Sequence, residues 1–236
     1  WFPTGGGKTE AYLFLIACLL FYRRLEKESL DTSDGVAVIT RYTLRALTTD
    51  QFTRTTGLIC ACELVRREEI GSMPTSSPFS VGLWIGRAAT PNTLRGEEGA
   101  IFRGNVVDKV KQISECPCCY GEVNWKVNNM RPDQPIECSC ENADCDLASG
   151  LEKIPVHTVD EQIYNVSPSV IIGTVDKFIT ITMKPEKTKS LFNLASENKP
   201  PDLIIQDELH LISGPLGSIT GAFETTIDIG CKSEDG

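Results

Sequence analysis

The sequence predicts an α/β fold in which a mainly parallel sheet carries a nucleotide-binding loop and a small cysteine-rich metal-binding module is inserted. Three observations lead to this fold class. A glycine-rich loop at residues 4–9 is followed at once by a helical pattern. Several short apolar runs end in polar residues, which is typical of buried parallel strands. Six of the ten cysteines fall between Cys116 and Cys145, which indicates a metal cluster.

The glycine-rich loop has the residue types that a bound phosphate requires. Backbone N–H groups can turn inward on a phosphate, a lysine can reach the outer phosphates and a hydroxyl can ligate Mg²⁺. The residues expected in these roles are Thr4, Gly5, Gly6, Gly7, Lys8 and Thr9. Phe2 stands where the GxxxxGK[ST] pattern usually has a small residue, and a chance glycine-rich turn is the alternative.

An acidic pair far downstream favours nucleotide binding over a chance turn. Residues 202–206 read as a buried apolar strand that ends in Asp207 and Glu208. We expect Asp207 to hold Mg²⁺, and Glu208 to orient and deprotonate the attacking water. His210 follows closely and is either a nucleotide sensor or an ordinary satisfied polar group. The glycine-rich loop and the acidic pair together indicate nucleotide hydrolysis.

Composition narrows the function classes. The net charge is −9, from 32 acidic and 23 basic residues in 236, so any nucleic-acid binding must be local. The longest apolar run, residues 12–22, is about half of the ~20 residues that span a bilayer, which predicts a core helix and no membrane. Because no export signal is present, we expect a cytoplasmic protein with reduced cysteines. Only Trp1 precedes the loop motif, so the supporting strand is missing and we expect a fragment of a longer protein.

The elements follow from the hydrophobic pattern in chain order. We expect a helix over residues 10–28 whose charged end, from Arg23, moves out to solvent. The others are strands at 36–40, 81–86 and from 169, and helices at 51–70, about 106–113 and 219–229.

Polar residues at two strand ends are candidates for gripping a nucleic-acid backbone. Arg41 and Arg45 follow the strand at 36–40, and Thr174 and Lys177 follow the strand from 169. Ligands of open α/β sheets bind at this carboxyl edge, and such side chains suit phosphodiester contacts. For the arginines, a solvated helix start is an equally good interpretation.

The cysteines predict a structural zinc site. Two metal-binding turns can complete a tetrahedron of thiolates, and the expected ligands are Cys116, Cys119, Cys140 and Cys145. Cys118 and Cys138 are spare, and Cys138 could replace Cys140. An iron–sulfur cluster also takes four thiolates but is the second choice. The module, residues 97–159, would divide the nucleotide-binding lobe into residues 1–96 and 160–236; His157 within it is expected to be an ordinary polar group.

These motifs, in this order, resemble the first RecA-like lobe of superfamily 2 helicases. PTGGGKT looks like motif I, RYTLRALTTDQ like motif Ia, GTVDKF like motif Ib and DELH like the DEAH-type motif II. The sequences FPTGGGKTEAY, RYTLR and DELHLISGPLGS are similar to those of the large helicase of the DISARM antiphage defence system and its relatives. The resemblance covers nearly the whole chain.

The resemblance implies ATP-dependent movement on, or remodelling of, nucleic acid, with DNA favoured over RNA. ATP and Mg²⁺ would be the cofactors, and Rad3-type helicases keep the iron–sulfur alternative open. A second RecA-like lobe in the parent chain would supply an arginine finger, so the isolated chain is expected to be inactive; a defence-system protein is an expected partner. The competing hypothesis is a nucleotide-switched ATPase module that docks a protein through its cysteine-rich insertion.

Overall fold

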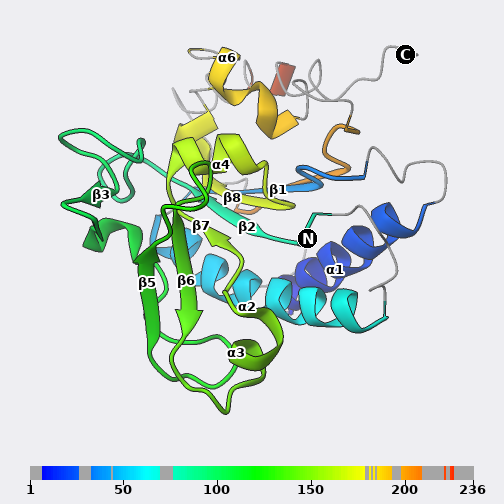
Figure 1. Cartoon of the computed structure of the whole chain (residues 1–236). Coiled ribbons are helices and arrows are strands. Elements are labelled where there is room, and N and C mark those ends of the chain that lie inside the picture. The colour runs from blue at the N-terminus through cyan, green and yellow to red at the C-terminus, as the bar shows by residue number, and fades with distance from the viewer. Residues whose placement is uncertain are drawn as a thin grey trace.

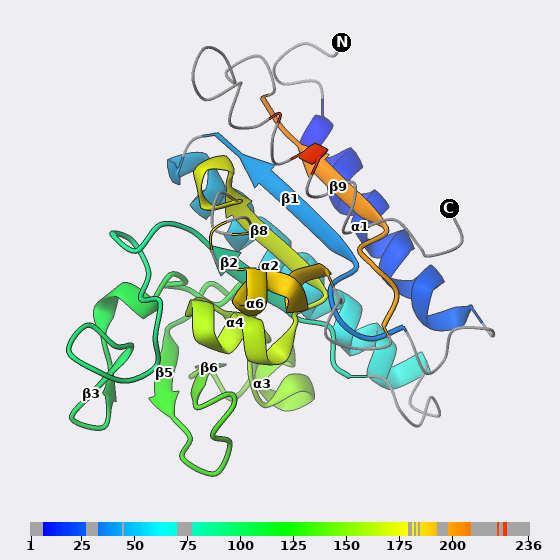
Figure 2. The same ribbon diagram turned by 90° about the horizontal axis from the view of Figure 1, so that it is seen from above.

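A parallel five-stranded sheet forms the centre of the protein (Figures 1 and 2). The structure is a computed structural model, and it describes residues 7–26, 33–43, 45–69, 77–178, 181, 183, 185–192, 198–208, 221 and 224–225. The strand order is β7-β2-β8-β1-β9, and every neighbouring pair is parallel. The predicted α/β class with a mainly parallel sheet is therefore confirmed.

The sheet strands are β1 Val38–Tyr42, β2 Val81–Trp84, β7 Val156–His157, β8 Val170–Thr174 and β9 Leu203–Gln206. The helices around the sheet are α1 Lys8–Leu25, α2 Arg45–Glu69, α4 Asp160–Val166 and α6 Pro185–Thr188. The cysteine-rich segment contributes β3 Ile101–Phe102, β4 Asn105–Val106, β5 Val123–Val127, β6 Ile136–Cys140 and α3 Asp146–Leu151. Short 3-10 helices lie at Asp108–Val110, Val175–Phe178 and Lys189–Phe192.

Helices cover both faces of the sheet because its strands are apolar on both sides. α1 and α2 lie on one face, and α4 and α6 on the other (Figures 1 and 2). Successive strand residues serve opposite faces: Val38 packs in the core with α1 and α2, whereas Ile39 packs on the other side with Trp84 and Phe178. None of the helices within the described ranges combines the length and apolar composition that a membrane crossing needs.

Two expectations about helices differ from the structure. Residues 106–113 are not an amphipathic helix, because Val106 pairs with Ile101 in the small β3–β4 hairpin and only one 3-10 turn follows. The second helix begins at Arg45 rather than residue 51, since the polar residues after β1 enter the helix directly. The helix expected at 219–229 lies largely outside the described residues.

Arg23 and Arg24, near the end of α1, are buried, which corrects the expectation that the helix moves out to solvent from Arg23. Arg23 is 3% exposed and donates hydrogen bonds to Asp202 and to the carbonyls of Ser33 and Pro200. Burying a charge is costly unless it is paired and hydrogen-bonded, and here the partners are supplied from the segment that leads into β9. Arg23 thereby fixes the position of β9 beside α1.

The cysteine-rich segment packs directly on α2. Cys116, Cys145 and Leu151 belong to the same buried cluster as Ile59 of α2 and Val81 of β2. β7 lies within residues 97–159, yet it pairs with β2 of the main sheet. Part of the cysteine-rich segment thus shares a hydrophobic cluster with α2 and the sheet, while Ile101, Val106 and Ile136 belong to a separate cluster.

Candidate nucleotide and metal sites

The start of α1 has the backbone geometry expected after a phosphate-binding loop. Gly7 caps the helix with φ 73° and ψ 19°, a left-handed conformation that glycine adopts without steric cost. Its carbonyl accepts the N–H of Ala11 at 3.1 Å. Lys8 and Thr9 then open the helix, where free N–H groups and the helix dipole favour an anion. Thr4, Gly5 and Gly6 lie outside the described residues.

The structure brings Lys8 and Glu208 together from opposite ends of the sequence. Lys8 Nζ lies 3.9 Å from Glu208 Oε1, and each side chain is about a quarter exposed. The contact forms because β9 runs parallel to β1 and delivers its carboxyl end next to the start of α1 (Figure 2). Asp207 is held at this edge by its N–H, which donates to the carbonyl of Arg41 at 3.1 Å. The predicted phosphate-binding lysine therefore lies next to one of the two predicted hydrolytic carboxylates, and Asp207 precedes that carboxylate in the chain.

The backbone at Glu208 is strained. Its φ is 50°, which lies in the left-handed region that residues other than glycine rarely adopt. Residues with such strained backbone angles are concentrated at functional sites. The turn is supported locally, since the Glu208 N–H donates to Asp207 Oδ1 at 2.9 Å. His210, which follows, lies outside the described residues.

Two residues that sequence reasoning did not single out also reach this site. Gln51 of α2 places its Nε2 3.5 Å from Thr9 Oγ1, where it can orient that hydroxyl. Tyr42 ends β1; burial first, and then the negative charge of Asp207, raise the pKa of Tyr42 to about 12. Its hydroxyl therefore stays protonated at neutral pH. Both belong to the RYTLRALTTDQ stretch that resembles motif Ia, but their approach to this site depends on α2 and β1 packing against α1.

Arg41 is buried in this conformation. The residue is 3% exposed, and its guanidinium forms a 2.7 Å ion pair with Glu224 and lies 5.6 Å from the centre of the Phe178 ring. Its Nε and Nη1 have no hydrogen-bond partner in the part of the chain that the structure describes. Arg45 opens α2, and its side chain lies outside the description. The predicted role of these arginines in nucleic-acid binding stays a prediction.

Thr174 and Lys177 lie at the carboxyl end of β8, as expected, but both are buried. Lys177 is 7% exposed, pairs with Asp160 of α4 at 2.6 Å and lies 5.8 Å from the Trp84 ring centre. Thr174 is 4% exposed, and its hydroxyl has no hydrogen-bond partner within the described ranges. Their predicted contact with a nucleic-acid backbone also stays a prediction.

The four predicted cysteine ligands converge on one point. All four sulfur atoms lie within 4.8 Å of one another, with 3.7 Å between Cys116 and Cys145 and 3.6 Å between Cys119 and Cys140. Zn–S bonds of about 2.3 Å in a tetrahedron separate sulfur atoms by about 3.8 Å. A four-iron cluster interposes iron and sulfide between its cysteines and so needs a wider spacing. The four cysteines could hold a single metal ion such as zinc.

The two cysteine-bearing turns are closed by backbone hydrogen bonds. The carbonyl of Cys116 accepts the N–H of Tyr120, whose φ of 57° closes the first turn. The Gly121 N–H then donates to the Cys119 sulfur and lowers the pKa of Cys119 to about 7. Deprotonated sulfur is the form that binds a metal. The second turn is closed by the Cys145 N–H, which donates to the carbonyl of Asn142 at 3.1 Å.

The two spare cysteines lie outside the cluster for different reasons. Cys118 is exposed in the first turn. Cys138 is 1% exposed; burial, and then the charges of Cys116 and Cys140, raise its pKa to about 12. The Cys140 sulfur is one of the four that converge and the Cys138 sulfur is not, so the geometry favours Cys140 over Cys138.

Metal content can test this assignment. We expect Cys140→Ser to lower the metal bound per chain well below that of the unaltered protein, because it removes one of the four converging thiolates. Cys138→Ala, the matched control on the same strand, is expected to keep full metal content. Elemental analysis of both purified variants measures the difference. Metal loss in Cys138→Ala alone would reverse the assignment.

No model of a known protein family matches the chain. The chain is similar to the DISARM protein DrmA of Bacillus paralicheniformis (strain ATCC 9945a / NCIMB 11709 / CD-2). The two are 39% identical over an alignment of 273 residues, which includes 97% of this chain. The same alignment covers 24% of DrmA, so the chain spans about a quarter of the length of this curated relative. The similarity to DrmA supports the link to DISARM that the sequence motifs indicate.

Proposed function

We propose that the chain is the ATP-binding, RecA-like lobe of a larger helicase or translocase that acts on DNA in antiphage defence. The observation that carries this proposal is the approach of Lys8 to Glu208, 3.9 Å apart although 200 positions separate them. A cation for the outer phosphates and a carboxylate for the attacking water are the two groups that nucleotide hydrolysis needs in one place. The similarity to DrmA supports the defence setting.

The chain's own residues would divide the work as follows. The N–H groups at the start of α1 and the ammonium of Lys8 would hold the phosphates. Thr9, oriented by Gln51, and Asp207 would hold Mg²⁺, which neutralises developing negative charge when it is bound. Glu208 would leave its contact with Lys8, accept a proton from water and direct the water at the outer phosphate. A second lobe would complete the site with an arginine.

One observation favours the second candidate, a nucleotide-switched module that docks a basic protein. Glu115, Glu122 and Glu141 lie in a row, since Glu115 bridges to Glu122, and the Glu141 N–H donates to the Glu122 carbonyl. All three are exposed, and no described residue forms an ion pair with them. Adjacent like charges are destabilising; a basic partner would relieve this, whereas DNA would be repelled.

A salt titration of DNA binding separates the two candidates. If Arg41 and Arg45 contact phosphates, the Arg41→Ala/Arg45→Ala variant of the full-length protein is expected to bind single-stranded DNA more weakly. The slope of log K against log salt concentration should also become shallower by about 2, because each lost phosphate contact removes about one unit. Fluorescence anisotropy across a salt series measures both quantities. The same samples are also assayed for ATP hydrolysis with single-stranded DNA, duplex DNA, RNA or no addition. The nucleic acid that stimulates hydrolysis is the one on which the protein acts.

Two control variants keep this test interpretable. Glu224→Gln breaks the ion pair of Arg41 but keeps the cation, so it should not weaken DNA binding. Arg103→Ala removes an exposed arginine that lies over the Phe102 ring, and it should leave the slope unchanged. An unchanged slope in the double variant, together with ATP hydrolysis indifferent to every nucleic acid, would favour the partner-docking switch.

A further inference from the structure

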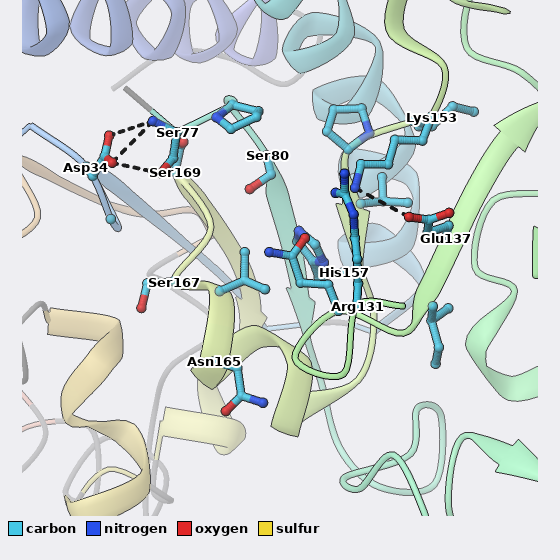
Figure 3. A pocket seen from close by; sticks show the side chains of 18 of the residues that line it. Asp34, Ser77, Ser80, Arg131, Glu137, Lys153, His157, Asn165, Ser167 and Ser169 are labelled. Atoms are coloured by element: carbon cyan, nitrogen blue, oxygen red, sulfur yellow. Dashed lines mark hydrogen bonds and ion pairs between the residues drawn. The ribbon is translucent and has the colours of Figure 1, made fainter. Parts of the chain in front are cut away.

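A polar cavity of about 580 Å³ lies at the amino ends of the sheet strands (Figure 3). Ser80 directly precedes β2, Ser169 directly precedes β8, and His157 lies in β7. Because the strands are parallel, Lys8 and Glu208 lie at the opposite edge of the sheet. The cavity is within the size range of small-molecule sites, about 300–1,000 Å³, and none of the predicted functional residues lines it.

Three largely buried polar residues line this cavity. Ser80 is 6% exposed and Ser169 4% exposed, and neither hydroxyl forms a hydrogen bond with a described residue. His157 is 7% exposed, and its one hydrogen bond is at Nδ1, 2.8 Å from Gln162 Nε2. None of these polar atoms is among the fully buried ones that lack a partner, so each opens onto the cavity. Three polar groups that open onto one cavity can hydrogen-bond to water or to a ligand there.

The hydrogen bond of His157 determines what that residue offers. The side-chain amide of Gln162 also donates to the carbonyl of Ile136 at 3.1 Å, so the amide nitrogen faces the imidazole and Nδ1 must accept. The proton of the neutral ring is then on Nε2. Burial, and then the positive charge of Lys153, lower the pKa of His157 to about 3. His157 is therefore a neutral N–H donor throughout the physiological pH range.

Two cations next to these donors favour an anionic occupant. Lys153 and Arg131 both line the cavity, and burial, followed by the charge of Arg131, lowers the pKa of Lys153. Lys153 has one distant ion-pair partner, Glu137 at 3.6 Å, and Arg131 forms no side-chain ion pair with a described residue. An anion between the two would relieve their repulsion.

The remaining charges on the lining are accounted for. Arg24 pairs with Asp34, which also accepts hydrogen bonds from Ser77 (Figure 3). Arg67 pairs with Glu63, and Glu152 is exposed. Arg131 is thus the cation with the most freedom to bind a ligand.

We propose that this cavity is a second ligand site, separate from the nucleotide site, which binds a small phosphorylated molecule through Arg131, Lys153 and the donors Ser80, Ser169 and His157. Hydroxyls, a neutral imidazole N–H and a guanidinium are donors that a phosphate monoester accepts from. The volume leaves room for a sugar or nucleoside attached to the phosphate. This site does not depend on the proposed motor function.

Isothermal titration calorimetry of the full-length, metal-loaded protein tests the proposal. The protein carries Lys8→Ala, so that the nucleotide loop does not contribute phosphate binding. The probes are inorganic phosphate, ribose 5-phosphate and AMP. Saturable binding of at least one probe is expected, and the order of their affinities distinguishes free phosphate, a sugar phosphate and a nucleotide as the source. If none of the three probes binds, the proposal is overturned and water is the occupant of the cavity.

Variants locate the binding. Arg131→Ala is expected to lower the affinity for the tightest-binding probe at least about tenfold, which is the usual effect of losing a hydrogen bond to a charged group. Arg103 is an exposed arginine outside the cavity, and Arg103→Ala should leave the affinity unchanged. Ser80→Ala/Ser169→Ala should also weaken binding yet leave the melting temperature unchanged or higher, because neither hydroxyl has a partner to lose. Affinity unchanged in both cavity variants would place the ligand elsewhere and contradict the site.

Discussion

Full-length protein with Glu208→Gln is expected to hydrolyse ATP at least about 100-fold more slowly than the unaltered protein, because a general base typically contributes a factor of 10²–10⁴. Glutamine keeps the size of the side chain but cannot accept a proton from water. The change also removes the carboxylate that lies 3.9 Å from Lys8, so the lysine becomes free for phosphate. Nucleotide affinity should therefore be preserved or increased. Steady-state phosphate release and equilibrium binding of labelled ATP measure the two effects separately.

The matched control for this prediction is Glu68→Gln. Glu68 is exposed near the end of α2 and forms no side-chain hydrogen bond or ion pair with a described residue, so its neutralisation should leave the rate within about twofold of the unaltered protein. Equal rates for Glu208→Gln and the unaltered protein would remove the catalytic role from the end of β9. A parallel loss of ATP binding would instead indicate that Glu208 shapes the site rather than activates water.

The second large effect is expected from the metal site. Cys116→Ser should abolish metal binding and destabilise this region by about 3 kcal/mol or more, because metal binding contributes directly to folding at such sites. Cys116 is fully buried within the core that joins the cysteine turns to α2. At about 2–4 °C per kcal/mol for a chain of this size, the melting temperature should fall by roughly 6–12 °C. Calorimetry and elemental analysis measure stability and metal content together.

Cys118→Ser controls for cysteine chemistry in the same turn. Cys118 is exposed and outside the four converging sulfur atoms, so its replacement should change neither metal content nor melting temperature. If Cys116→Ser lost the metal without a change in melting temperature, the site would be a removable attachment and not part of the folding core.

Local chemistry could be predicted from the sequence, whereas side-chain exposure could not. The spacing of Cys116 and Cys119 within one turn determines where their thiols point, and an apolar run before Asp207 determines which edge of a sheet it reaches. The burial of Arg41 and Lys177 depends on Glu224 and Asp160, which are brought in by tertiary packing. Nothing near either residue in the sequence indicates these pairs.

The same distinction explains the missed cavity and the misplaced helix. The cavity is lined by segments that are far apart in the sequence, and Ser80, Arg131 and Ser169 are too widely separated to form a motif. At residues 106–113 the valines fit a helix or a strand, and pairing of Val106 with Ile101 decides the outcome. In both cases the deciding interaction is with a part of the chain that a local pattern does not contain.

The close packing of the cysteine-rich segment on α2 limits how this region can evolve. A side chain added at Gly150 of α3 would come within 2.4 Å of a methyl carbon of Leu64, so the two positions are constrained jointly. An insertion that merely hung from a loop could be exchanged between homologues as a cassette. Here a cysteine-rich segment taken from a homologue would pack on an α2 whose residues fit a different segment. Functional chimaeras should therefore require that the contacting residues of α2 be exchanged together with the segment.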